Sequence, residues 1–248
     1  MLRQGSSTAR IALSLVAGTL GLCATASVAN ASASSDAATA RSINLKGSDL
    51  PKAAKWSTST VAATPAALGK KAVTCIRKAG GTASKASDDL FGMVGRPGGA
   101  VRADVTSPMF GMKGSFTGLP GANSETVVAS STSQALKDLA AIGAKTARSC
   151  LASLYAQVTA AQSGGGKVKA SASAEPLQRF GAGSGGVHDR FVVSGGNVPG
   201  KLYLDLYFYV VRRVEVSVTF TGLGTVFPTK WATSTVANVM KRAKSLAK

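Results

Sequence analysis

The last two strand-like runs of the chain constrain its fold most, because each alternates between two kinds of side chain. From Lys201 to Arg212, Leu and Phe alternate with Tyr, Asp and Val, and from Val214 to Thr221, Val and Phe alternate with polar residues. A period of two is typical of strands with an aliphatic face on the core and a polar-aromatic face outward. Shorter runs at 167–174 and 187–194 indicate further strands.

Three amphipathic helices are predicted as well. The first is capped by Thr64, begins at Pro65 and ends at Gly80. The second runs from a Ser133 cap to about Ala160, and the third runs from 229 to about 247. The third should turn a set of apolar residues inward, namely Val236, Val239, Met240, Ala243 and Leu246.

Two or three strands are expected between the first two helices, at about 88–94, 101–112 and 124–130. Trp56, after the extended segment 48–51, should anchor the start of the domain by packing. The order is therefore helix, strands, helix, strands, helix. It predicts an α+β fold in which about three helices lie on the apolar face of an antiparallel sheet.

The first 31 residues have the three parts of a secretory signal peptide. Arg3 and Arg10 precede an apolar run from Ile11 to Ala24, and a small-residue exit site ends at Ala31. A retained anchor helix is the alternative, although the run is shorter than the roughly 20 residues that span a bilayer. In a second variant Cys23 is acylated, which would make the protein a membrane-anchored lipoprotein. We expect a secreted protein with a flexible leader at 32–42 and a single domain at 43–248.

Beyond the leader the chain has two cysteines, Cys75 and Cys150, each on the apolar face of a predicted helix. An even count in an oxidising compartment suggests a disulfide bond that would tie the two helices together. Two buried free thiols are the alternative.

The part beyond residue 31 is strongly basic, with 27 Lys and Arg against 11 Asp and Glu, a net charge of +16. Such an excess favours anionic partners such as lipid headgroups, wall polymers or glycans, or it serves only to keep the protein soluble. No basic run with interleaved aromatic residues is present, so nucleic acid is a poor candidate partner.

No motif for catalysis, metal or cofactor binding survives inspection. Gly181, Gly183 and Gly186 match G-x-G-x-x-G, but a strand-like run follows where a dinucleotide site needs a helix. His188 is the only histidine, which argues against zinc, and its neighbour Asp189 offers an acid–base pair at most. Asp205 and Glu215 should face the same side of the last hairpin, where Arg212 and Arg213 would neutralise them.

Two surfaces are candidates for ligand binding. The outward tyrosines Tyr203, Tyr207 and Tyr209 would form an amphipathic patch suited to sugars or amphiphiles, unless another element covers them. The polar face of the first helix carries four cations, which bind an anionic ligand or are merely solvated: Lys70, Lys71, Arg77 and Lys78.

The sequence resembles the exported sensor-like domains of actinobacteria, typified by the extracellular domain of the serine/threonine kinase PknH. The matching features are Ser48-Asp49-Leu50-Pro51 with Trp56, the helices bearing Cys75 and Cys150, and the run from Tyr203 to Arg213. The resemblance implies an antiparallel sheet flanked by helices, with a cleft that holds a ligand. No kinase domain is part of these 248 residues.

These observations favour an exported, non-enzymatic binding or sensor-like domain for an anionic or amphiphilic component of the cell envelope. Two alternatives stay open. One is a secreted hydrolase that uses His188 with Asp189. The other is a module that binds another envelope protein through the tyrosine patch.

Overall fold

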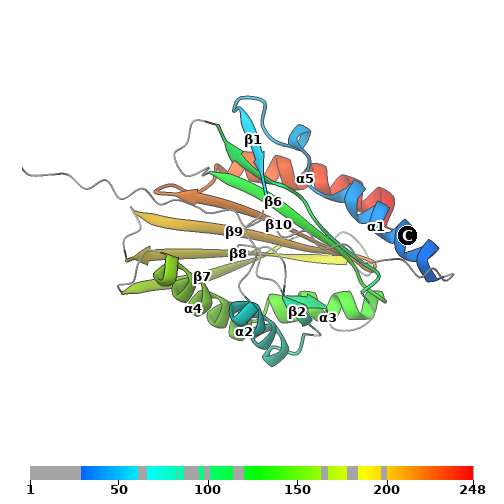
Figure 1. Cartoon of the computed structure of the whole chain (residues 1–248), viewed down its shortest axis with the longest axis horizontal. Coiled ribbons are helices and arrows are strands. Elements are labelled where there is room, and N and C mark those ends of the chain that lie inside the picture. Colours follow the sequence, from blue (N-terminus) through cyan, green and yellow to red (C-terminus); the bar gives the residue numbers. More distant parts are fainter. Residues whose placement is uncertain are drawn as a thin grey trace, which may run out of the picture.

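An antiparallel sheet runs through the molecule, and helices cover both of its faces (Figure 1). The computed structural model describes residues 29–60, 66–81, 83–86, 95–97, 101–113, 120–162, 167–177, 184–196 and 200–247. The expected strand at 88–94 lies outside these residues. The α+β class and the antiparallel sheet are confirmed.

The main sheet has eight strands. Its path runs from β1 (Trp56–Ser59) through β5 (Met109–Met112), β6 (Gly121–Val128), β10 (Val214–Leu223), β9 (Lys201–Val211) and β8 (Ser184–Gly195) to β7 (Val168–Leu177). The eighth, β4 (Ala103–Thr106), also pairs with β6, so the expected strand at 101–112 is two short strands. A separate two-stranded sheet joins β2 (Ala83–Ala86) and β3 (Gly95–Pro97).

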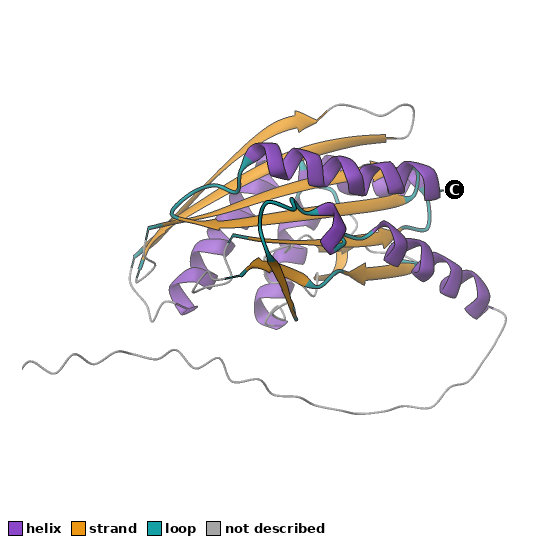
Figure 2. Ribbon diagram, turned by 90° about the horizontal axis from the view of Figure 1, so that it is seen from above, coloured by secondary structure: helices purple, strands orange, loops and turns teal. Residues whose placement is uncertain are grey.

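Five α-helices are described, and they divide between the two faces of the sheet. On one face lie α2 (Ala66–Lys78), α3 (Thr132–Ile142) and α4 (Lys145–Gln162). On the other lie α1 (Ala29–Ile43) and α5 (Thr229–Leu246), beside a short 3-10 helix, η1 (Gly47–Asp49). Figure 2 shows α5, which ends at the label C, crossing in front of the sheet, with helices of the other face behind the sheet.

The register of the last hairpin explains why helices pack on both faces of the main sheet. A two-residue turn, with Arg212 in the left-handed region at a φ of 55°, pairs Val211 with Val214. The Leu and Phe set of β9 therefore faces α2–α4, whereas the Val and Phe set of β10 faces α1 and α5. The expectation of one aliphatic face and one outward polar face is wrong, because each strand contributes apolar residues to a different core.

The second predicted helix is two helices. Its cap is Ser131 and not Ser133, since the Ser131 hydroxyl accepts a hydrogen bond from the backbone NH of Gln134 at 3.1 Å. The helix is interrupted at Gly143, which caps the C-terminus of α3, and α4 begins at Lys145. Glycine is one of the poorest helix formers, which makes this the natural place for the interruption.

The N-terminal part of the domain also differs from expectation. Residues 32–42 are not a flexible leader but lie within α1, where Ala40 is fully buried. Asp36 accepts two hydrogen bonds from the Arg213 guanidinium, at 2.7 and 3.1 Å. Residues 47–49 form η1 in place of an extended segment, and Trp56 does pack, against Phe227 and Trp231 with ring centroids 6.2 and 6.4 Å away.

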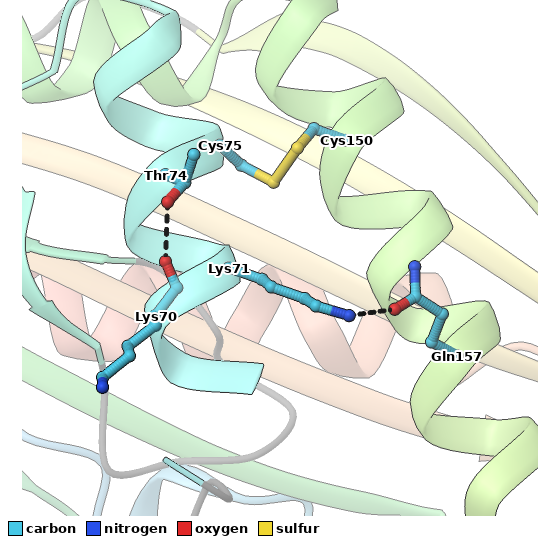
Figure 3. Close-up of a disulfide and its surroundings, with 6 residues drawn as sticks. All are labelled: Lys70, Lys71, Thr74, Cys75, Cys150 and Gln157. Atoms are coloured by element: carbon cyan, nitrogen blue, oxygen red, sulfur yellow. Dashed lines mark hydrogen bonds between the residues drawn. A yellow bond between two sulfur atoms is a disulfide. The ribbon is translucent and has the colours of Figure 1, made fainter. Parts of the chain in front are cut away.

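The disulfide between Cys75 and Cys150 is present and joins α2 to α4, with 5.6 Å between the two Cα atoms (Figure 3). β7 to β10, α2 and α5 are confirmed close to their expected bounds. Leu246 is the exception on α5, because its side chain is exposed and not turned inward. No helix in the described part of the chain is long and apolar enough to cross a membrane.

Candidate functional site

A cavity of about 890 Å³ lies between α5 and the strands β8 and β9. This volume is within the usual range for small-molecule sites. The sheet contributes its floor through His188, Arg190, Tyr207 and Tyr209. Helix α5 contributes its wall through eight residues, Thr229, Thr233, Val236, Ala237, Met240, Lys241, Lys244 and Ser245.

The floor is organised around Asp205, which is 2 % exposed and lies beneath the cavity on β9. One of its carboxylate oxygens, Oδ1, is 2.9 Å from His188 Nε2 and accepts a hydrogen bond from Arg190 Nε at 2.6 Å. Burial alone would raise the pKa of Asp205, but the hydrogen bonds and charges of His188 and Arg190 outweigh it and hold the pKa below its ordinary value. Asp205 is thus a charged anchor that fixes both side chains.

Aromatic rings form the middle of the floor. The His188 and Tyr207 rings stack with centroids 4.2 Å apart and an interplanar angle of 7°. Tyr209 lies further along β9, and burial, with a smaller contribution from Tyr207, raises its pKa to about 12. Its hydroxyl therefore stays protonated at any physiological pH.

The wall formed by α5 is held by contacts at both helix ends. Phe227, just before the helix, packs on Phe220 of β10 with ring centroids 4.6 Å apart. Arg242 donates hydrogen bonds to both carboxylate oxygens of Asp49 in η1, at 2.7 and 2.6 Å, and to backbone carbonyls of Ile43 and Asn44. The α5 side chains that line the cavity are therefore positioned by a helix that is anchored elsewhere.

The predicted ligand residues do not form one surface. Tyr207 and Tyr209 line the cavity, but α5 covers them and they are 7 % and 6 % exposed, so they are not an open patch. Tyr203 lies on the same face of β9, nearer its start, and does not line the cavity. The tyrosine patch required by the protein-interaction alternative is thus absent from the described surface.

The four cations of α2 lie on the opposite side of the sheet. Lys70 and Lys71 line a smaller groove of about 400 Å³ that also contains the disulfide, and Lys71 Nζ donates to Gln157 Oε1 at 2.7 Å (Figure 3). Arg77 and Lys78 are exposed at the end of α2 and do not line this groove. Cations and tyrosines therefore belong to separate sites.

His188 and Asp189 cannot act on one substrate as an acid–base pair. They are adjacent in β8, so their side chains point to opposite faces of the sheet. Asp189 is fully buried on the α4 side, and its nearest cation is Arg148, with Nε 3.7 Å from Oδ1. Burial raises the pKa of Asp189 to about 7, against the opposing charges of Arg148 and His188.

Asp205 and Glu215 are also on opposite faces, contrary to the expected arrangement. Glu215 points towards α3 and is 2 % exposed. Burial, together with the nearby charges of Asp138, Glu125 and Asp104, raises its pKa well above the ordinary value. The hairpin arginines have other partners, Arg213 with Asp36 and Arg212 with the carbonyl of Ala247.

The glycine motif and the possible metal ligands are the remaining features that the sequence raised. Gly186 lies within β8, so a strand and not a helix follows the glycine motif, while Gly181 and Gly183 fall outside the described residues. Among the described side chains, no group of three or more His, Cys, Asp or Glu is placed to hold a metal ion.

The sequence did not indicate Arg190 or any α5 residue as part of a site, and Val236 and Met240 were expected only as inward-facing core residues. The one available signal was the lysine spacing on the polar side of the last helix, Lys241 and Lys244, which by itself indicates only a solvated face. Nothing in the sequence shows that this side lies over β8, some 50 residues earlier.

Comparison of the chain with protein-family models, with curated proteins and with solved structures finds no match.

Proposed function

We propose that this chain is an exported, non-enzymatic binding domain whose ligand is an anionic or amphiphilic component of the cell envelope. The observation that carries the proposal is the 890 Å³ cavity under α5, which combines apolar side chains with basic ones. Pockets of this kind bind a ligand through apolar area and use a few polar groups to fix its orientation. Tyr207 and Tyr209, expected from the sequence to contact the ligand, contribute to this cavity.

The basic composition supports the same proposal. A net charge of +16 beyond residue 31 raises the local concentration of anionic ligands by long-range attraction. The signal-peptide pattern and the disulfide between α2 and α4 agree with a protein that works outside the cytoplasm, either free or anchored through Cys23.

The resemblance to sensor-like domains supports a ligand-holding role, since it implies a cleft beside an antiparallel sheet. The hydrolase alternative loses its motivating pair, because His188 and Asp189 face different sides of β8. We therefore favour binding without chemistry on the ligand.

A cavity-filling substitution tests the proposal directly. Ala237 is exposed on α5 and lines the cavity, so Ala237→Trp should fill the cavity without disturbing either core. Ala140→Trp, at an exposed position of α3 on the other side of the sheet, is the matched control. The readout is fluorescence of the neutral probe N-phenyl-1-naphthylamine with the mature protein.

Wild type and Ala140→Trp should bind the probe, and Ala237→Trp should bind it at least about tenfold more weakly. Native mass spectrometry of protein purified from its own host should show a co-purified lipid or glycan in the wild type and less in Ala237→Trp. Equal probe binding by all three proteins would rule out the cavity as the site.

A further inference from the structure

The cavity has two ends of different chemistry, and the strand register places them. β8 and β9 pair Arg190 with Asp205, His188 with Tyr207, and Gly186 with Tyr209. Along the floor the order is therefore Arg190, then the His188–Tyr207 stack, then Tyr209. The first and last of these levels are four residues apart, or about 13 Å at 3.3 Å per residue.

Helix α5 runs over this floor in a direction that two contacts define. It begins after β10 ends, and the end of β10 pairs with the start of β9. At its other end, Arg212 in the hairpin turn donates a hydrogen bond to the carbonyl of Ala247, at 3.3 Å. Thr233 therefore lies towards the Arg190 end, while Lys241 and Lys244 lie towards the Tyr209 end.

The two ends differ in the basic groups that line them. At the first end the Arg190 guanidinium is neutralised by Asp205, which accepts its hydrogen bond at 2.6 Å. At the second end Lys241 and Lys244 both line the cavity and place two ammonium groups about one helical turn apart. An anionic group is thus favoured most at the lysine end.

The space between the ends is apolar. Val236 and Met240 face it from α5, and the Tyr207 ring faces it from the floor. At about 30 Å³ for each water-sized group, a volume of 890 Å³ takes on the order of 30 non-hydrogen atoms. That is enough for one headgroup with one acyl chain.

We infer that the ligand is an anionic single-chain amphiphile, a fatty acid or a lysophospholipid. Its headgroup lies at Lys241 and Lys244, and its chain runs along Val236 and Met240 towards His188. This inference rests on the proposed function, since it names the ligand class and the orientation at the same site. A fatty acid and an anionic lysophospholipid both have an anionic headgroup and a single acyl chain.

The experiment measures displacement of N-phenyl-1-naphthylamine, which has no charge, by three compounds below their micellar concentrations: dodecanoate, lauroyl lysophosphatidate and dodecyltrimethylammonium. The proteins are wild type, the double variant Lys241→Ala with Lys244→Ala, and Lys230→Ala. Lys230 is an exposed lysine of α5 that does not line the cavity, so it serves as the control. Binding of the neutral probe shows that each variant is folded.

Dodecanoate or the lysophosphatidate should displace the probe from wild type at about tenfold lower concentration than the ammonium compound, because charge-assisted hydrogen bonds favour the anion. The double variant should reduce this preference to about threefold or less, and Lys230→Ala should keep it. The better of the two anions identifies the source of the ligand.

Equal displacement by anion and cation, or a preference that survives in the double variant, would overturn the inference on headgroup and orientation. The proposed function would stand in that case if Ala237→Trp still bound the probe at least about tenfold more weakly than wild type. Failure of wild type to bind the probe, or normal binding by Ala237→Trp, would instead defeat the proposed function.

Discussion

His188 of β8 and Asp205 of β9 face each other beneath the cavity, with 2.9 Å between Nε2 and Oδ1. The same carboxylate oxygen accepts a hydrogen bond from Arg190. One buried acid therefore fixes two side chains of the floor.

Asp205→Asn should remove the negative charge that Arg190 Nε contacts at 2.6 Å. We expect the free energy of unfolding at pH 7 to fall by about 1–3 kcal/mol, measured by urea denaturation. Because the folded pKa of Asp205 lies below its ordinary value of 3.8, wild type should lose this contribution only as the pH falls below about 4. The variant should lack that acid-side loss, and a variant as stable as wild type at pH 7 would contradict the role of Asp205.

Asp189, on the other face of the same strand, should have the opposite pH dependence. Its carboxylate oxygens accept no hydrogen bond from any described residue, and burial raises its pKa from 3.8 to about 7. The folded state then holds a proton that the unfolded state loses above about pH 4. The free energy of unfolding should decrease as the pH rises from about 4 to 7, by at most about 4 kcal/mol.

The measurement is urea denaturation of wild type and Asp189→Asn at several pH values between 4 and 8. The variant cannot ionise, so its stability should change less across this range, and the difference between the two proteins should grow with pH. Parallel curves for wild type and variant would show that Asp189 is charged in the folded protein throughout.

The disulfide between Cys75 and Cys150 closes a loop with a sequence separation of 75 residues. In the chain-entropy account a cross-link of that span stabilises the fold by roughly 4.5 kcal/mol. The double variant Cys75→Ser with Cys150→Ser should lose about this much in urea denaturation. It should still bind the neutral probe in its native state, because α2 and α4 lie across the sheet from the cavity.

Intact-mass measurement of wild type provides the control, since the oxidised protein is two daltons lighter than the reduced one. Loss of probe binding by the folded double variant would contradict the separation of the two faces.

The sequence predicts best those helices and strands in which apolar residues recur at a regular spacing. β7 to β10 and α5 follow from alternation and from the helical spacing of apolar residues. α1 has no such signal, because its buried side is made of small residues such as Ala37 and Ala40, which also occur in mobile leaders. The composition of α1 is thus compatible with either state, and packing on β4, β6 and α5 decides between them.

The faces of the hairpin strands were assigned wrongly for a different reason. Alternation divides the residues of each strand into two sets. It does not say which set of β9 shares a face of the sheet with which set of β10. The turn at Arg212 and Arg213 decides this, since a two-residue turn pairs Val211 with Val214 and so puts Tyr209 beside Val216. A two-residue turn places Tyr207 and Tyr209 on the same face as the Val and Phe set of β10, which is a core-facing side.

The cations of α2 are the last feature with a testable role. Lys70, Lys71, Arg77 and Lys78 are exposed on one side of α2, away from the cavity. We expect this side to attach the protein to anionic surfaces through charge alone, independently of the ligand site. The attraction should weaken with salt, because the Debye length is about 10 Å at 0.1 M ionic strength.

Replacing all four cations by Glu should reduce retention on phosphatidylglycerol vesicles at low salt and weaken its dependence on salt. The matched control replaces four exposed lysines elsewhere, Lys52, Lys55, Lys137 and Lys145, which changes the net charge equally. If both quadruple variants lose retention alike, net charge and not the α2 surface is responsible. If only the α2 variant loses it while probe binding in the cavity is unchanged, then membrane attachment and ligand binding use opposite faces of the sheet.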